Sequence, residues 1–120
     1  MSGVPPASPV AVCDSASLKE QGDGIRFELD FGGERLPAFA IRIDGVARAY
    51  LNRCSHVPIE LDWIPGRFLD PESMMILCAT HGAQYDPRSG RCLGGPCRGR
   101  GLQRLGCEER DGMIWSWAED

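Results

Sequence analysis

The stretch "CATHGAQYD", residues 78–86, places a cysteine and a histidine three positions apart and continues at once with glycine. The chain has only 2 histidines in 120 residues. The other one, His56, stands two positions after Cys54 in "RCSHVP". Each pair follows a segment with strand character, residues 46–54 and 73–78. The pattern predicts a metal centre held by two loops that meet at one end of a sheet.

Four candidate ligands, Cys54, His56, Cys78 and His81, suit two kinds of centre. A tetrahedral zinc ion accepts two thiolates and two imidazoles, and so does a [2Fe–2S] cluster with mixed ligation. Zinc fingers usually pair cysteine with cysteine and histidine with histidine, whereas here each loop supplies one of each. This order favours the cluster, with both cysteines on one iron and both histidines on the other. A structural zinc module is the alternative.

The rest of the chain has the pattern of short antiparallel strands. Pairs such as Asp44-Gly45 and Asp111-Gly112 stand between apolar runs and are hairpin signals. One helical turn is expected in "SASLKEQ", capped by Ser15 or Ser17. With 15 glycines and 9 prolines there is little room for long helices. We therefore predict an all-β fold, with strands at residues 25–31, 36–43, 46–51, 73–78, 102–109 and 113–117 and long loops at 52–67 and 79–101.

Length and composition limit the other classes of function. A chain of 120 residues with 42% hydrophobic and 25% charged residues corresponds to one ordinary globular domain. We expect a flexible tail at residues 1–8 and a single domain at residues 9–120. The net charge of −4 argues against nucleic-acid binding. The sequence has no long apolar run and no signal peptide, so we expect no membrane contact and a cytoplasmic location.

The segments "CSH", residues 54–56, and "CATHGAQYDPRSGRCLGGP", residues 78–96, resemble the two cluster-binding loops of Rieske [2Fe–2S] proteins. The resemblance extends over most of residues 9–118. It implies the Rieske fold, in which stacked antiparallel sheets carry a two-loop cluster-binding subdomain. It also implies one [2Fe–2S] cluster as the cofactor.

The resemblance assigns roles to individual residues. Cys54 and Cys78 would bind the buried iron, and His56 and His81 would bind the outer iron through Nδ1. The residues around the cluster would be Gly82, Tyr85 and Pro96.

Departures from the family pattern indicate the ferredoxin subgroup. Ile59 and Thr80 stand where respiratory Rieske proteins carry two further cysteines joined as a disulfide. Ala83 replaces a serine that donates a hydrogen bond to a bridging sulfide. Fewer donors favour a midpoint potential in the lower part of the family range of about −150 to +300 mV.

The resemblance implies a soluble one-electron carrier without a substrate site of its own. Both histidines are assigned to the cluster, so none remains for a mononuclear iron site or a general base. The expected partners are an NAD(P)H-dependent flavoprotein reductase and a terminal oxygenase. The alternative is a small Rieske-like subunit beside the large subunit of a nitrite reductase or in another oxidoreductase complex.

The remaining cysteines, Cys13, Cys92, Cys97 and Cys107, match no ligand position of the family. We expect them to be free thiols that fill space, because disulfides are rare in a reducing compartment. Cys92 and Cys97 flank "LGGP", and a disulfide between them is the less favoured alternative.

Overall fold

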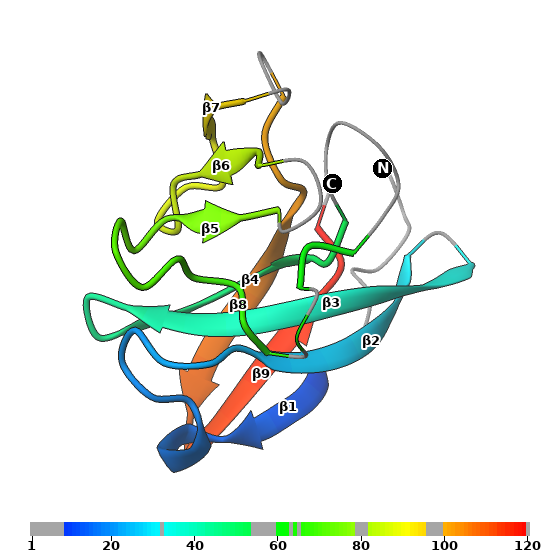
Figure 1. The fold of residues 1–120 in the computed structure, drawn as a ribbon. Helices are drawn as coiled ribbons and strands as arrows, with labels where there is room; N and C mark the ends of the chain where they lie inside the picture. The colour runs from blue at the N-terminus through cyan, green and yellow to red at the C-terminus, as the bar shows by residue number, and fades with distance from the viewer. Residues whose placement is uncertain are drawn as a thin grey trace.

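A computed structural model describes residues 9–31, 33–53, 60–62, 64, 66–78, 82–95 and 100–119. Within these ranges the chain forms nine strands in two antiparallel sheets and one short 3-10 helix, as Figure 1 shows. The elements are β1 (Val10–Asp14), η1 (Ser15–Ser17), β2 (Ile25–Phe31), β3 (Glu34–Ile43), β4 (Val46–Leu51), β5 (Ile76–Leu77), β6 (Gln84–Tyr85), β7 (Cys92–Gly94), β8 (Arg104–Arg110) and β9 (Met113–Trp117).

The larger sheet has six strands in the order β1-β9-β8-β4-β3-β2. Its two edge strands, β1 and β2, approach each other closely, so the sheet curls toward a barrel. Asp44 and Gly45 both have positive φ at the β3–β4 turn, and so do Asp111 and Gly112 at the β8–β9 turn. These are the two-residue hairpin turns that the Asp-Gly pairs predict.

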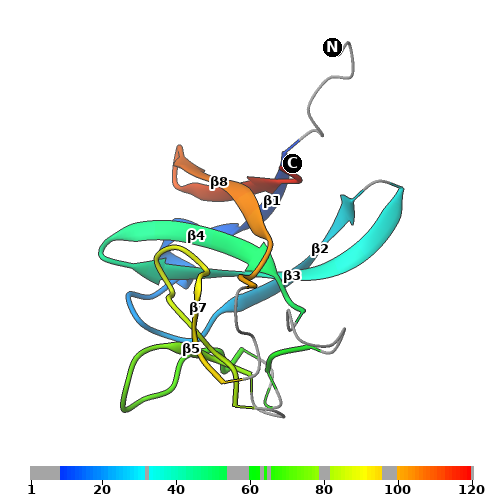
Figure 2. The same ribbon diagram turned by 90° about the horizontal axis from the view of Figure 1, so that it is seen from above.

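The smaller sheet has three strands in the order β5-β6-β7 and lies against one side of the larger sheet (Figures 1 and 2). It carries Cys78 directly after β5 and Tyr85 within β6. The predicted all-β architecture of stacked antiparallel sheets is therefore confirmed.

Strand β3 is buried on both faces and separates two hydrophobic cores. Ala38 and Ala40 point into the core inside the curled sheet, together with Leu29 and Ile114. The alternate residues of β3 point the other way, into the core under the smaller sheet. That second core contains Phe39, Ile41, Ile43, Tyr50, Leu61, Phe68, Ile76, Cys78, Ala83, Tyr85 and Leu102.

Most predicted strands are present with small shifts of their ends. The predicted strand at 73–78 shortens to Ile76–Leu77, and β1, β6 and β7 were not predicted. The helical turn is a 3-10 turn without a side-chain cap, so the capping prediction for Ser15 or Ser17 is wrong. Residues 1–8 lie outside the described ranges, so the tail and the domain boundary stay predictions. No helix in the described ranges is long and apolar enough to cross a membrane.

An arginine on β3 fastens the curled sheet across its width. Arg42 donates two parallel hydrogen bonds of 2.9 Å to the carboxylate of Glu109 on β8. It also donates to the carbonyl oxygens of Leu18, Ser15 and Gly45. The hydrogen bonds from Arg42 to the Glu109 carboxylate lower the pKa of Glu109 from 4.5 to about 2.

This pKa shift predicts acid sensitivity. The contribution of Glu109 to the free energy of unfolding is fully present above the ordinary pKa of 4.5 and is lost as the pH falls toward about 2. We expect the Glu109→Gln variant to lose less stability than the unchanged protein over this range, as measured by urea unfolding at several pH values.

The control is Glu34→Gln, because Glu34 is exposed and makes no ion pair with the other described residues. Glu34→Gln should leave the pH profile unchanged. Identical profiles for Glu109→Gln and the unchanged protein would contradict the role of the Arg42 pair.

Candidate metal centre

A tight turn after β5 presents the second predicted loop. The N–H of Cys78 donates to the carbonyl oxygen of Ala83, and the N–H of Gly82 donates to that of Cys78, both at 2.8 Å. Gly82 has φ of 74°, a conformation that L side chains rarely adopt. These two hydrogen bonds set Cys78 beside Ala83. All of Cys78, Ala83 and Tyr85 have an exposed fraction of 0%.

A second glycine supports this turn from outside. Gly95 follows β7 with φ of 82°, and a Cβ atom there would lie 2.9 Å from the carbonyl oxygen of Gly82 and 3.0 Å from the Cα of Ala83. Only a residue without a side chain can pack this closely at that φ. The end of β7 therefore forms the back of the Cys78–Ala83 turn.

The first predicted loop is closed at its base by a buried polar network. Asn52 accepts from the N–H of Leu61 and donates to Asp62, both at 2.8 Å. Asp62 also accepts from the N–H of Gly66 at 2.9 Å and lies 3.4 Å from Nε of Arg26. Asn52 is fully buried, and so is the side chain of Asp62. The two ends of the segment that contains Cys54 and His56 are therefore tied together.

Of the four predicted ligands, the structure describes only Cys78. Cys54, His56 and His81 lie outside the described residues, as does Pro96. The described part of the chain accordingly contains no group of three His, Cys, Asp or Glu side chains that could hold a metal ion. The full ligand set stays a prediction, but the described residues show how both loops are held. Tyr85 pairs with Ile76 and Cys92 in the smaller sheet.

Sequence reasoning did not identify the Asn52–Asp62 network. Its only signal in the sequence is a pair of short polar side chains just before and after the first loop. Neither the burial of these side chains nor their hydrogen bonds follows from that pattern.

The other cysteines differ in state. Cys13 and Cys107 are free thiols, as predicted, and burial raises the pKa of Cys107 to about 11. Cys92, in contrast, is disulfide-bonded, so the prediction of a free thiol there is wrong. That prediction rested on the redox state of the cytosol, which does not decide whether two thiols lie within bonding distance. Cys97 lies outside the described residues.

The described residues thus form an all-β domain with a tight turn beside its smaller sheet. The model of the Rieske [2Fe–2S] domain family matches residues 8–107. The chain belongs to this family. One [2Fe–2S] cluster is the cofactor of such a domain, and this finding argues against the zinc alternative.

Solved structures share the fold. The chain is similar to the ferredoxin of carbazole 1,9a-dioxygenase from Nocardioides aromaticivorans IC177, with a TM-score of 0.71 and 23% identity over 94% of this chain and 100% of that one. It is also similar to a chain in a complex of reduced oxygenase and oxidized ferredoxin of carbazole 1,9a-dioxygenase, with a TM-score of 0.71 and 19% identity over 93% and 94% of the two chains.

A third likeness is to a larger chain. Dicamba monooxygenase matches with a TM-score of 0.69 and 25% identity over 96% of this chain, which spans 34% of the monooxygenase. A search of curated protein sequences found no match to this chain.

The described residues fit a [2Fe–2S] cluster at this place. Cys78 offers a soft thiol in a water-excluded position and is not disulfide-bonded. The backbone around it is held by two glycines at positive φ, and no described residue lies within 4 Å of a Cβ added at Gly82.

The buried network predicts the effect of an alanine at position 52. The Asn52→Ala variant leaves the N–H of Leu61 and one oxygen of Asp62 without their partners. We expect the free energy of unfolding to fall by about 1–3 kcal/mol, and the iron content per chain to fall with it. Urea unfolding and iron analysis measure the two effects.

The matched control is Glu60→Gln, which removes an exposed ion pair with Arg26. Its expected cost is about 0–1 kcal/mol. Equal stability and iron content for Asn52→Ala and Glu60→Gln would refute the role of the network in holding the first loop.

The contact between Gly95 and the Cys78–Ala83 turn predicts the effect of an alanine at position 95. The Gly95→Ala variant places a methyl group 2.9 Å from a backbone oxygen, so the turn must shift. We expect reduced iron and sulfide per chain and a faster loss of visible absorbance on standing in air.

Gly112→Ala is the control, because Gly112 has a similar φ of 75° and nothing lies within 4 Å of its added Cβ. It carries the backbone strain of about 1–2 kcal/mol without the collision. The prediction fails if both variants keep the same cluster content.

Proposed function

We propose that the protein is a one-electron carrier of the Rieske ferredoxin kind. The observation that carries this proposal is the match of a Rieske [2Fe–2S] domain to a dioxygenase ferredoxin over all of that ferredoxin. Both histidines of the chain stand in the predicted ligand set, so neither is available as a general base. The protein is therefore an electron-transfer component rather than an enzyme with its own substrate.

The bound cluster supplies one-electron chemistry, and this chain's residues hold and shield it. Cys54 and Cys78 are the proposed ligands of the inner iron, and His56 and His81 are those of the outer iron. Cys78 enters the core beneath the smaller sheet with Ala83 and Tyr85, where water is excluded. Exclusion of water protects a sulfur-ligated cluster from hydrolysis and oxidation.

The potential should lie low in the Rieske range. Ala83 is fully buried beside Cys78 and offers a methyl group in place of a hydroxyl donor. A hydroxyl donor to the cluster would stabilise the added electron, so its absence favours a lower potential.

The proposed partners are a flavoprotein reductase and a terminal oxygenase. One of the structural neighbours is a complex of reduced oxygenase and oxidized ferredoxin in carbazole 1,9a-dioxygenase. Ile64 and Leu93, exposed by 58% and 52%, offer apolar contacts to a partner. Service as a small subunit of a nitrite reductase is the second candidate. The cytoplasmic location also remains a prediction.

Replacement of Cys78 tests the cluster and the function together. We expect the purified protein to contain two irons and two sulfides per chain and to show visible bands that bleach with dithionite. The Cys78→Ser variant should lose this absorption because serine does not replace a buried thiolate ligand.

The control is Cys107→Ser, which alters a free thiol on β8 and should keep the full cluster. A colourless unchanged protein, or a Cys78→Ser variant with an intact spectrum, would overturn the assignment. Oxidation of the dithionite-reduced protein by a Rieske oxygenase in a stopped-flow mixer then distinguishes a ferredoxin from a nitrite reductase subunit.

A further inference from the structure

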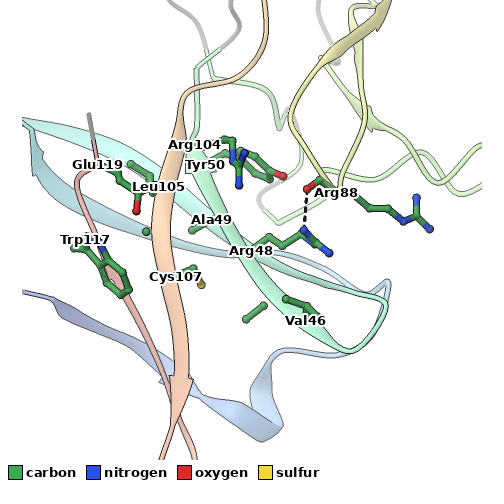
Figure 3. A pocket seen from close by; sticks show the side chains of 12 residues that line it. Val46, Arg48, Ala49, Tyr50, Arg88, Arg104, Leu105, Cys107, Trp117 and Glu119 are labelled. Atoms are coloured by element: carbon green, nitrogen blue, oxygen red, sulfur yellow. Dashed lines mark hydrogen bonds between the residues drawn. The ribbon is translucent and has the colours of Figure 1, made fainter.

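A hollow of about 280 Å³ opens between β4, β8 and β9, beside the turn that follows β6 (Figure 3). It lies outside the loops assigned to the cluster. Its lining combines charged and aromatic side chains, including Arg48, Tyr50, Arg104, Trp117 and Glu119. The volume is close to the lower end of small-molecule sites, about 300 Å³.

The strand register explains why these side chains share one face. Tyr50 is paired with Arg104 across β4 and β8, and Arg48 lies two residues from Tyr50 on the same face of β4. Gly106 lies two residues from Arg104 and is paired with Trp117 on β9. Arginines from two strands and an indole from a third therefore surround the same space.

Gly106 allows the indole to form a wall of this hollow. A Cβ atom on Gly106 would lie 2.0 Å from Cε2 of Trp117, so the ring rests directly on the glycine backbone. Any side chain at position 106 would displace the ring. The indole thus presents an apolar surface next to the arginines.

Arg48 has unused hydrogen-bonding capacity. Its Nη1 donates to the carbonyl oxygen of Arg88 at 2.8 Å, the contact drawn as a dashed line in Figure 3. Its Nε is buried and has no hydrogen-bond partner. Its Nη2 makes no hydrogen bond to the other described residues and is the nitrogen that an anion in the hollow can engage.

The charges of the hollow are not balanced by the protein's own carboxylates. Among the described residues, no carboxylate lies within ion-pair distance of Arg48 or Arg104. Arg88 is different, because its guanidinium pairs with Asp44 at 2.6 Å. Among the described lining residues Glu119 is the one acidic side chain, and it is exposed. The hollow therefore favours an anion.

We propose that this hollow binds a small aromatic carboxylate. The carboxylate pairs with Arg48 and Arg104, and the flat ring lies against the indole of Trp117. An apolar wall beside two arginines favours this ligand over an inorganic anion, because only an aromatic ring can pack against the indole. The inference does not depend on the electron-carrier function.

The test is titration calorimetry of the intact, cluster-containing protein with benzoate. We expect saturable binding of one benzoate per chain with a Kd of about 1 mM or below. Arg48→Gln and Arg104→Gln should each weaken binding by about tenfold, because each removes a charged hydrogen-bond donor. Glu119→Gln should tighten binding, because it removes a negative charge from the lining.

The control variant is Arg35→Gln, which alters an exposed arginine paired with Glu28 on the β2–β3 hairpin and should bind benzoate unchanged. Visible spectra establish that each variant is folded. If Arg48→Gln does not fold, the opposite effects expected for Arg104→Gln and Glu119→Gln still decide the question. The proposal is overturned by absent or non-saturable benzoate binding, by equal binding of inorganic phosphate, or by variants that behave like Arg35→Gln.

Discussion

The burial of β3 on both faces is the constraint on which the rest of the structure depends. Ala38 and Ala40 fill the inside of the curled sheet, while Phe39 and Ile41 pack under the smaller sheet. The ring of Phe39 stacks on Phe68 with 3.8 Å between ring centroids. Small residues on one face and large residues on the other let one strand serve two cores. The cluster-binding part therefore cannot move away from the barrel without exposing apolar surface of β3.

The two predicted loops are held by different kinds of interaction. The second loop depends on backbone geometry, since Gly82 and Gly95 pack where side chains would collide or be strained. The first loop depends on buried polar side chains, since Asn52 and Asp62 bind backbone groups at its two ends. A ligand set divided between two loops needs both ends fixed in this way. Otherwise the entropy of the loops would oppose assembly of the site.

Much of the fold was predictable because local patterns agree with the final contacts. Asp-Gly pairs predict the β3–β4 and β8–β9 turns, and alternation predicts the long strands. Strands β6 and β7, of two and three residues, were not predicted, because so short a segment shows no periodicity. The burial of Asn52 could not be predicted either, because the sequence does not show which polar groups form hydrogen bonds with each other. The disulfide state of Cys92 depends on the distance between two sulfur atoms, which an argument from the redox state of the compartment cannot supply.

Tyr50 links the proposed anion site to the cluster-binding part. Its ring belongs to the core under the smaller sheet, and its hydroxyl donates to the carbonyl oxygen of Pro87 at 2.8 Å. Arg48 donates to the carbonyl oxygen of the next residue, Arg88. Strand β4 therefore donates hydrogen bonds to two adjacent carbonyl groups of the turn after β6. One of the two donors, Arg48, also lines the hollow. A ligand that engages Nη2 of Arg48 leaves the Nη1 hydrogen bond to Arg88 intact, so it adds to the anchoring of this turn rather than competing with it.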